Sequence, residues 1–293
     1  MAILSSEGRT LKELAEIFQR KKSAIESRLK KHSLKYVGLE TKELHENKKV
    51  QSCCSEKDTT EGVGLELERT TIEMVCLANS RKLSERCVAG KILGHGFSGV
   101  WVRPVSSRST GELSRSEINF QQGISPQLLD IISLQLVNPV SHPYQSENWL
   151  NDAKTSWKKV GELPVEKLAE LCDDPNSLWV NGYHSYNGVN DRFPVEMADD
   201  LLGGSLRLVK PEKPVLWVGQ ELHGKIKVRC RFSCNGETYS LVVTDPVVEA
   251  KYLAMENGDY PLTSNNACLC VSIGEPHQGF CYKLVAGVIG PEV

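Results

Sequence analysis

The sequence predicts a mainly β protein: two small β-barrel-like units with an interposed helix, preceded by a small helical unit on a linker. Short runs that alternate apolar and polar residues recur from residue 72 to residue 289. A period of two is typical of half-buried strands. Gly and Pro separate these runs, whereas the first 36 residues show helical spacing instead. The chain has 293 residues, a length that accommodates two or three domains.

The N-terminal unit, residues 1–36, shows the pattern of two short helices. Leu11, Leu14 and Phe18 recur at helical spacing, and Thr10 followed by Glu13 forms a capping box. The stretch LKELAEIFQRKKSAIESRLKKHSL resembles the helix-turn-helix of transcriptional regulators and Myb-like domains. The resemblance implies that the second helix enters a DNA major groove. It places near the DNA Lys21, Lys22, Ser23, Ser27 and Lys30. The alternative is a helical hairpin that docks on a protein surface.

Residues 37–71 are polar and charged and show little periodicity. Such a composition is typical of a linker. We therefore expect the helical unit to be tethered to the following domains, not fused to them.

The first β unit is expected over residues 72–145. Its first strand alternates through Ile72, Met74 and Cys76 and is expected to end in a turn at residues 78–80, with further strands at 87–93, 99–106 and 130–136. Residues 146–180 form a connecting segment with a helix near 164–173. The second β unit is expected over residues 181–293.

The stretch KIKVRCRFSCNGETYSLVVTDP, residues 225–246, carries the clearest local pattern of the second unit. Asn235-Gly236 between two alternating runs predicts a two-residue type I′ hairpin, with Phe232 opposite Tyr239. One face collects Ile226, Val228, Cys230 and Phe232, and the other carries Lys225, Lys227, Arg229 and Arg231. The four cations, expected to point to solvent, form either an outer face that blunts an edge strand or a track for a nucleic-acid backbone.

Several blocks together resemble the bacterial dual-OB domain family over about residues 72–290: CLANSRKLSERCVAGK, WVRPVSSRSTGELS, SLWVNGYHSYNGVNDRFP, SLRLVKPEKPVLWV, YSLVVTDPVVE and CLCVSIGEPHQGFCYKLVAGVI. The resemblance implies two OB-folds and, by fold analogy, nucleic-acid binding. No catalytic residue is implied by it.

Binding candidates in the first β unit are also basic. Arg81, Lys82 and Arg86 cluster at one predicted loop, and Arg103 and Arg108 are expected to contact solvent or a ligand. The run at residues 106–109, SSRS, either holds phosphate oxygens or is a plain loop.

Composition and missing motifs exclude several function classes. The net charge of −2 argues against a uniformly basic nucleic-acid binder, so cations must act in local patches. The chain shows neither an apolar run long enough to span a bilayer nor a signal peptide, and we expect a cytoplasmic protein. Phosphate-loop, hydrolase and metalloprotease motifs are absent. The ten cysteines are expected to be free thiols rather than disulfides or metal ligands.

The sequence therefore favours a non-enzymatic nucleic-acid-binding protein, without cofactor or metal, that prefers DNA to RNA. The alternative is an adaptor that recruits a protein partner or senses a ligand in a larger bacterial system such as phage defence. Dependence on ionic strength separates the two, because phosphate contacts weaken steeply with salt.

Overall fold

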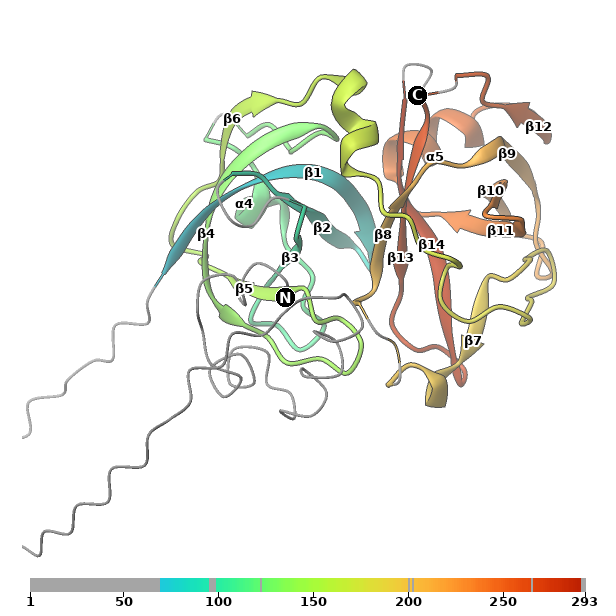
Figure 1. Ribbon diagram of the computed structural model, residues 1–293, viewed down its shortest axis with the longest axis horizontal. Helices are drawn as coiled ribbons and strands as arrows, with labels where there is room; N and C mark the ends of the chain where they lie inside the picture. The colour runs from blue at the N-terminus through green and yellow to red at the C-terminus, as the bar shows by residue number, and fades with distance from the viewer. Residues whose placement is uncertain are drawn as a thin grey trace, which may run out of the picture. The chain divides into compact units, whose positions relative to one another are not determined.

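The computed structural model describes residues 69–290, except 95–98, 122, 200, 202 and 265. It contains two β-sheets and a few short helices (Figure 1). The predicted helix-turn-helix and nearly all of the predicted linker lie outside the described residues. The mainly β class with two OB-like barrels is confirmed for residues 69–290.

The first sheet closes into a five-stranded barrel. Its strands follow the order β1-β2-β3-β5-β4-β6. An additional pairing of β1 with β4 closes β1-β2-β3-β5-β4 into the barrel, and β6 extends the sheet beyond β4. β3 and β5 run parallel, whereas the other pairs are antiparallel. The strand bounds are β1 Thr70–Lys82, β2 Glu85–Ile92, β3 Trp101–Val105, β4 Asp130–Pro139, β5 Asn148–Asn151 and β6 Lys158–Glu162. The short helix α4, Arg115–Ile118, lies between β3 and β4 in the chain.

The second sheet repeats this strand order. Its path is β12-β9-β10-β11-β14-β13-β8, and β7 pairs with β14. β8 pairs with β13 and β9 with β10, while only Lys210 and Pro211 separate β8 from β9. The chain therefore passes directly from β8, at one end of the sheet path, into β9, near the other end. Its bounds are β7 Arg192–Pro194, β8 Leu206–Val209, β9 Glu212–Gln220, β10 Ile226–Cys234, β11 Glu237–Val243, β12 Gly258–Pro261, β13 Cys268–Ile273 and β14 Phe280–Ile289.

Helix α5, Pro246–Leu253, follows β11, as α4 follows β3 in the first barrel. Two 3-10 helices complete the described elements. η1, Val165–Leu171, connects the barrels, and η2, Val195–Met197, follows β7. The helix expected near 164–173 is therefore present as a 3-10 helix, with Leu168 buried.

The predicted hairpin is confirmed with its register. Phe232 opposes Tyr239, their rings stack with centroids 5.4 Å apart, and Asn235 and Gly236 both have positive φ. A type I′ turn requires this backbone conformation at both central positions. Ile226 departs from the prediction: it begins β10 and is 49% exposed.

Two expected boundaries in the first barrel are wrong. β1 runs without a break through residues 78–80, because β2 pairs with it as far as Lys82, and the turn follows at Leu83 and Ser84. The barrel also extends beyond residue 145, since β5 and β6 belong to its sheet. A β-bulge between Cys76 and Ala78 interrupts the regular alternation of β1 just before residues 78–80, where the turn was expected.

An apolar cluster joins the two barrels. It combines Leu77 and Ala89 of the first barrel with Leu208, Cys270 and Ala286 of the second. The eight described cysteines are free thiols, as expected, and six of them are buried. Residues 69–290, with the gaps given above, show no cluster of three or more His, Cys, Asp or Glu suited to a metal ion. No helix among them is long and apolar enough to cross a membrane.

Candidate nucleic-acid interface

The outward face of β9 and β10 carries the predicted cations together with a tryptophan. Across the two strands Arg229 pairs with Trp217, and Lys227 pairs with Gly219. Leu216 and Val218 are buried, so alternation turns Trp217 outward, where it is half-buried. The sequence pattern of β9 already contained this information. An interpretation based on the charged strand alone overlooked the aromatic residue beside it.

The indole ring of Trp217 lies directly against the backbone of Gly219. A Cβ atom added at Gly219 would be 2.0 Å from the ring, so this approach requires glycine. The guanidinium of Arg231 lies 4.7 Å from the ring centroid. We call Trp217, Gly219, Lys227 and Arg231 the Trp217 platform. Its ring lies against Gly219, with the guanidinium of Arg231 beside it, and Lys227 lies across from Gly219 on β10.

The cations of this face differ in whether an acidic side chain pairs with them. Lys225 is exposed and Lys227 half-buried, and neither forms an ion pair with any residue that the structure describes. Arg231 lies 3.1 Å from Asp259, with the two side chains 41% and 59% exposed. Ion pairs this exposed are weak, about 0–1 kcal/mol. A ligand phosphate can therefore compete for Arg231.

Arg229 does not point to solvent, contrary to the prediction. Its side chain is 4% exposed, and its Nε lies 2.6 Å from Glu221 and its Nη1 3.2 Å from Asp191. Nη1 also donates to the Ser240 carbonyl at 3.0 Å. Asp191, in the loop that precedes β7, and Glu221, directly after β9, together neutralise the charge. Arg229 is thus a structural anchor.

The same loop presents two tyrosines at the surface. Asn187 donates to the Gln220 carbonyl at 3.0 Å, which fixes the loop to the end of β9. The Asn190 backbone N–H donates to His184 at 2.9 Å within the loop. Tyr183 and Tyr186 are both exposed. They are exposed aromatic side chains on a loop that is bound to the end of β9.

The cations predicted at the end of β1 do lie together. Arg81 and Arg86 face each other across β1 and β2. Arg81 pairs with Glu249 at 2.8 Å and Lys82 with Glu275 at 3.0 Å. Burial lowers the pKa of Arg86, and the positive charges of Arg115 and Arg81 lower it further.

Arg108 and Arg103 have different environments. Arg108 is an exposed loop residue that pairs with Glu117. Arg103 is 3% exposed, which contradicts the expected solvent contact. Its Nη2 lies 3.2 Å from Glu147 and donates to Ser205 at 3.0 Å. Because Arg103 belongs to β3 and Ser205 immediately precedes β8, this buried cation connects the barrels.

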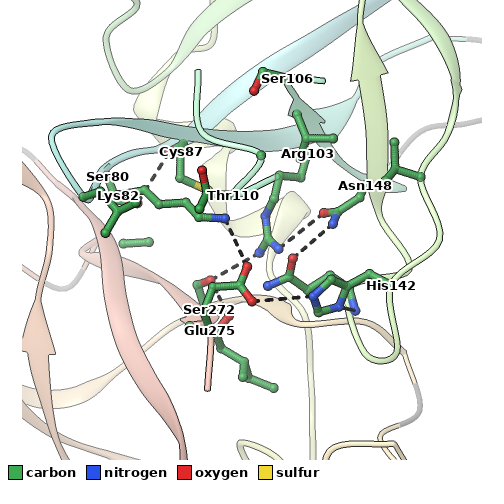
Figure 2. A pocket seen from close by; sticks show the side chains of 18 of the residues that line it. Ser80, Lys82, Cys87, Arg103, Ser106, Thr110, His142, Asn148, Ser272 and Glu275 are labelled. Carbon is green, nitrogen blue, oxygen red and sulfur yellow. Dashed lines mark hydrogen bonds and ion pairs between the residues drawn. The ribbon is translucent and has the colours of Figure 1, made fainter. Parts of the chain in front are cut away.

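Arg81, Lys82, Arg103 and Arg108 all line one cleft of about 560 Å³ between the barrels (Figure 2). Residues from both barrels form its walls. Tertiary structure therefore groups these candidates at a cleft that is separate from the Trp217 platform.

Comparison with known proteins bears on the barrels alone. Among solved structures, one described as tetrameric p202 HIN2 has 11% identity and a TM-score of 0.28, covering 80% of this chain and all of that one. A structure described as the molecular basis for abrogation of activation of pro-inflammatory cytokines has 8% identity and a TM-score of 0.29, covering 80% and 98%. TM-scores this low do not establish a shared fold.

No curated protein matches. The sequence profile of the dual OB-containing domain matches residues 72–288, most of the chain. The chain therefore belongs to the dual OB-containing domain family.

Proposed function

We propose that this protein binds single-stranded nucleic acid, without catalysis, on the Trp217 platform. The observation that carries the proposal is a half-buried indole ring held against Gly219 and bordered by Lys227 and Arg231. OB-folds bind oligonucleotides on the face of their second and third strands and on adjoining loops. The platform takes Lys227 and Arg231 from β10, the second strand of its barrel, and Trp217 from the neighbouring first strand, β9. Bases stack on the aromatic ring while phosphates pair with cations, and this combination tolerates any sequence.

The charge distribution determines what such binding should look like. Arg229 is neutralised, so the cations offered to phosphates are Lys227 and Arg231 of the platform and the neighbouring exposed Lys225. Each phosphate contact to a single strand contributes about −0.7 to the slope of log affinity against log salt. Three contacts predict a slope near −2, shallower than that of a strongly basic binder.

The first prediction tests the ring. Replacing Trp217 by Ala should weaken binding of a labelled single-stranded oligonucleotide by about 1–3 kcal/mol, the value of one stacked base. Trp217→Phe, which keeps an aromatic face, should retain most of the affinity. Fluorescence polarisation with single-stranded DNA and RNA at two salt concentrations measures both. Lys227→Glu should flatten the salt slope, whereas Lys154→Glu in the first barrel, which makes the same charge change at an exposed site, should not. Equal affinity of wild type and Trp217→Ala would contradict the proposal.

We further propose that residues 1–36 bind duplex DNA as a helix-turn-helix, which is the basis for favouring DNA over RNA. Lys21, Lys22, Ser23, Ser27 and Lys30 lie outside the described residues, so the resemblance in sequence is the support. Deleting residues 1–36 should remove duplex binding and leave single-strand binding intact. An electrophoretic shift with both substrates distinguishes the two contributions.

The adaptor alternative is favoured by a separate observation. Among the candidates of the first barrel, Arg81, Lys82, Arg103 and Arg108 each have a carboxylate partner. Paired cations suit protein or small-ligand recognition better than a polyanion track. Binding that persists unchanged from low to high salt would favour the adaptor.

A further inference from the structure

The cleft between the barrels has the size and position of a ligand site. Its volume of about 560 Å³ lies within the range of small-molecule pockets. The first barrel contributes the end of β1 and the loop from Ser106 to Gly111, and the second contributes residues 272–275. A bound molecule would therefore touch both barrels at once.

The lining of the cleft is rich in hydroxyl groups and cations. The hydroxyl-bearing lining residues are Ser80, Ser106, Ser109, Thr110, Ser141, Thr244 and Ser272. Gln145 and Asn148 add amide groups. The lining includes no Trp, Tyr or Phe among the described residues, and the imidazole of His142 is its one aromatic ring there.

The charge at the cleft surface is predominantly positive. Arg81, Lys82, Arg103 and Arg108 line it, against the single carboxylate of Glu275. The acids that pair with the three arginines, Glu249, Glu147 and Glu117, are not part of the lining. The lining therefore holds four cations and one carboxylate, and three of the cations are paired with acids outside the lining.

Glu275 is itself occupied by two partners. It lies 3.0 Å from Lys82 and 3.6 Å from His142, and Figure 2 shows these three side chains as one row across the cleft. The contact with His142 and that with Lys82 lower the pKa of Glu275 to about 2, so the carboxylate stays ionised. It marks where an anion would compete for Lys82.

The buried end of the cleft holds an unsatisfied donor. The Nε of Arg103 has no hydrogen-bond partner among the described residues, although Nη2 is shared by Glu147, Ser205 and Ser272. A buried donor without a partner costs about 1–3 kcal/mol. Because this atom is buried, a ligand in the cleft would not contact it directly.

We propose that this cleft binds a sugar phosphomonoester, with the phosphate at Lys82 and the loop Ser106–Gly111 and the sugar hydroxyls at the serine, threonine and amide groups. Lys82 Nζ lies 4.0 Å from the position that a Cβ of Gly111 would occupy, so the cation and the loop form one wall. Phosphate accepts charge-assisted hydrogen bonds from such a wall, and hydroxyls exchange hydrogen bonds with the rest. The site is independent of the Trp217 platform.

Titration calorimetry of the full chain with ribose 5-phosphate, ribose and inorganic phosphate tests this proposal. Ribose 5-phosphate should bind at least about tenfold more tightly than either fragment, because charge-assisted and hydroxyl contacts act together. Lys82→Met should weaken it about tenfold and Lys82→Arg should preserve it. Glu275→Gln should strengthen it, because the competing carboxylate is lost. Lys154→Met, outside the cleft, is the control.

The opposite signs expected for Lys82→Met and Glu275→Gln separate a ligand site from a structural ion pair, which would respond in the same direction to both changes. A 5′-phosphorylated oligonucleotide that binds better than its 5′-hydroxyl counterpart, with the difference lost in Lys82→Met, would show the same chemistry presented on a strand. No heat with ribose 5-phosphate, or binding that Lys82→Met leaves unchanged, would overturn the proposal. Trp217→Ala should not affect the binding of ribose 5-phosphate, so the two proposals fail separately.

Discussion

At the scale of single residues, the acidic neighbours of a cationic side chain determine whether that side chain is available to a ligand. Arg229 and Lys227 are two positions apart on one strand face, yet Arg229 is buried between two carboxylates and Lys227 has none. Lys283 shows the extreme case. It is buried, and its Nζ donates to the Val180 carbonyl at 2.7 Å and to Asn181 at 2.9 Å. Burial lowers the pKa of Lys283 to about 7.

This pKa predicts a pH dependence of stability. Between pH 7 and pH 10 the unfolded chain binds a proton at Lys283 that the folded chain does not. The free energy of unfolding should therefore rise with pH, by at most about 1.4 kcal/mol per unit from this group. Lys283→Met removes the contribution. Urea unfolding of both proteins at pH 7, 8 and 9 measures it, and a constant difference between them would contradict the lowered pKa.

At the scale of elements, one carboxylate connects the end of β11 to α5 and β14. Asp245 caps α5 by accepting from the backbone of Val247 at 3.0 Å and Val248 at 3.3 Å, and it also accepts from Val288 of β14 at 3.3 Å. Asp before Pro is a common turn signal. The helix that follows and its connection to β14 depend on that one side chain.

Replacing Asp245 by Ala should destabilise the protein by about 1–2 kcal/mol, because the cap is lost and buried N–H groups remain without acceptors. Asp245→Asn keeps a carbonyl oxygen at the cap and should lose less. Chemical unfolding of the two variants compares them. Equal losses would mean that charge, not the acceptor oxygen, is what the cap requires.

At the scale of the whole described region, the two barrels act as one unit because apolar and ionic contacts cross between them. Leu77 of β1 and Leu208 of β8 share a buried cluster, and the Arg103–Glu147 pair reaches Ser205 and Ser272 of the second barrel. Removing one member of a buried ion pair leaves the other charge without compensation, which costs more than the pair contributes.

Arg103→Met should therefore destabilise the protein by about 3–5 kcal/mol, and the double variant Arg103→Met/Glu147→Gln should recover part of the loss. Unfolding followed by tryptophan fluorescence and by circular dichroism tests this cycle. Additive losses would show that the two side chains are not energetically coupled.

Patterns with a short period were sufficient to predict strands, their faces and the Asn235-Gly236 register, because alternation and turn chemistry are local properties of the backbone. The resemblance in sequence was sufficient to predict the dual OB-containing domain family. Trp217 was also visible in the alternation of β9, once its neighbours Leu216 and Val218 are assigned to the core.

Only the tertiary structure decided which cations are free of acidic partners and so available to bind a ligand. Asp191 reaches Arg229 from 38 residues away, and Glu275 reaches Lys82 from 193 residues away. No local pattern contains such pairings, because electrostatic neutralisation depends on distance in space and not on distance in sequence. For the same reason the cleft, assembled from both barrels, is a property of the fold, whereas the strands that build it are a property of the sequence.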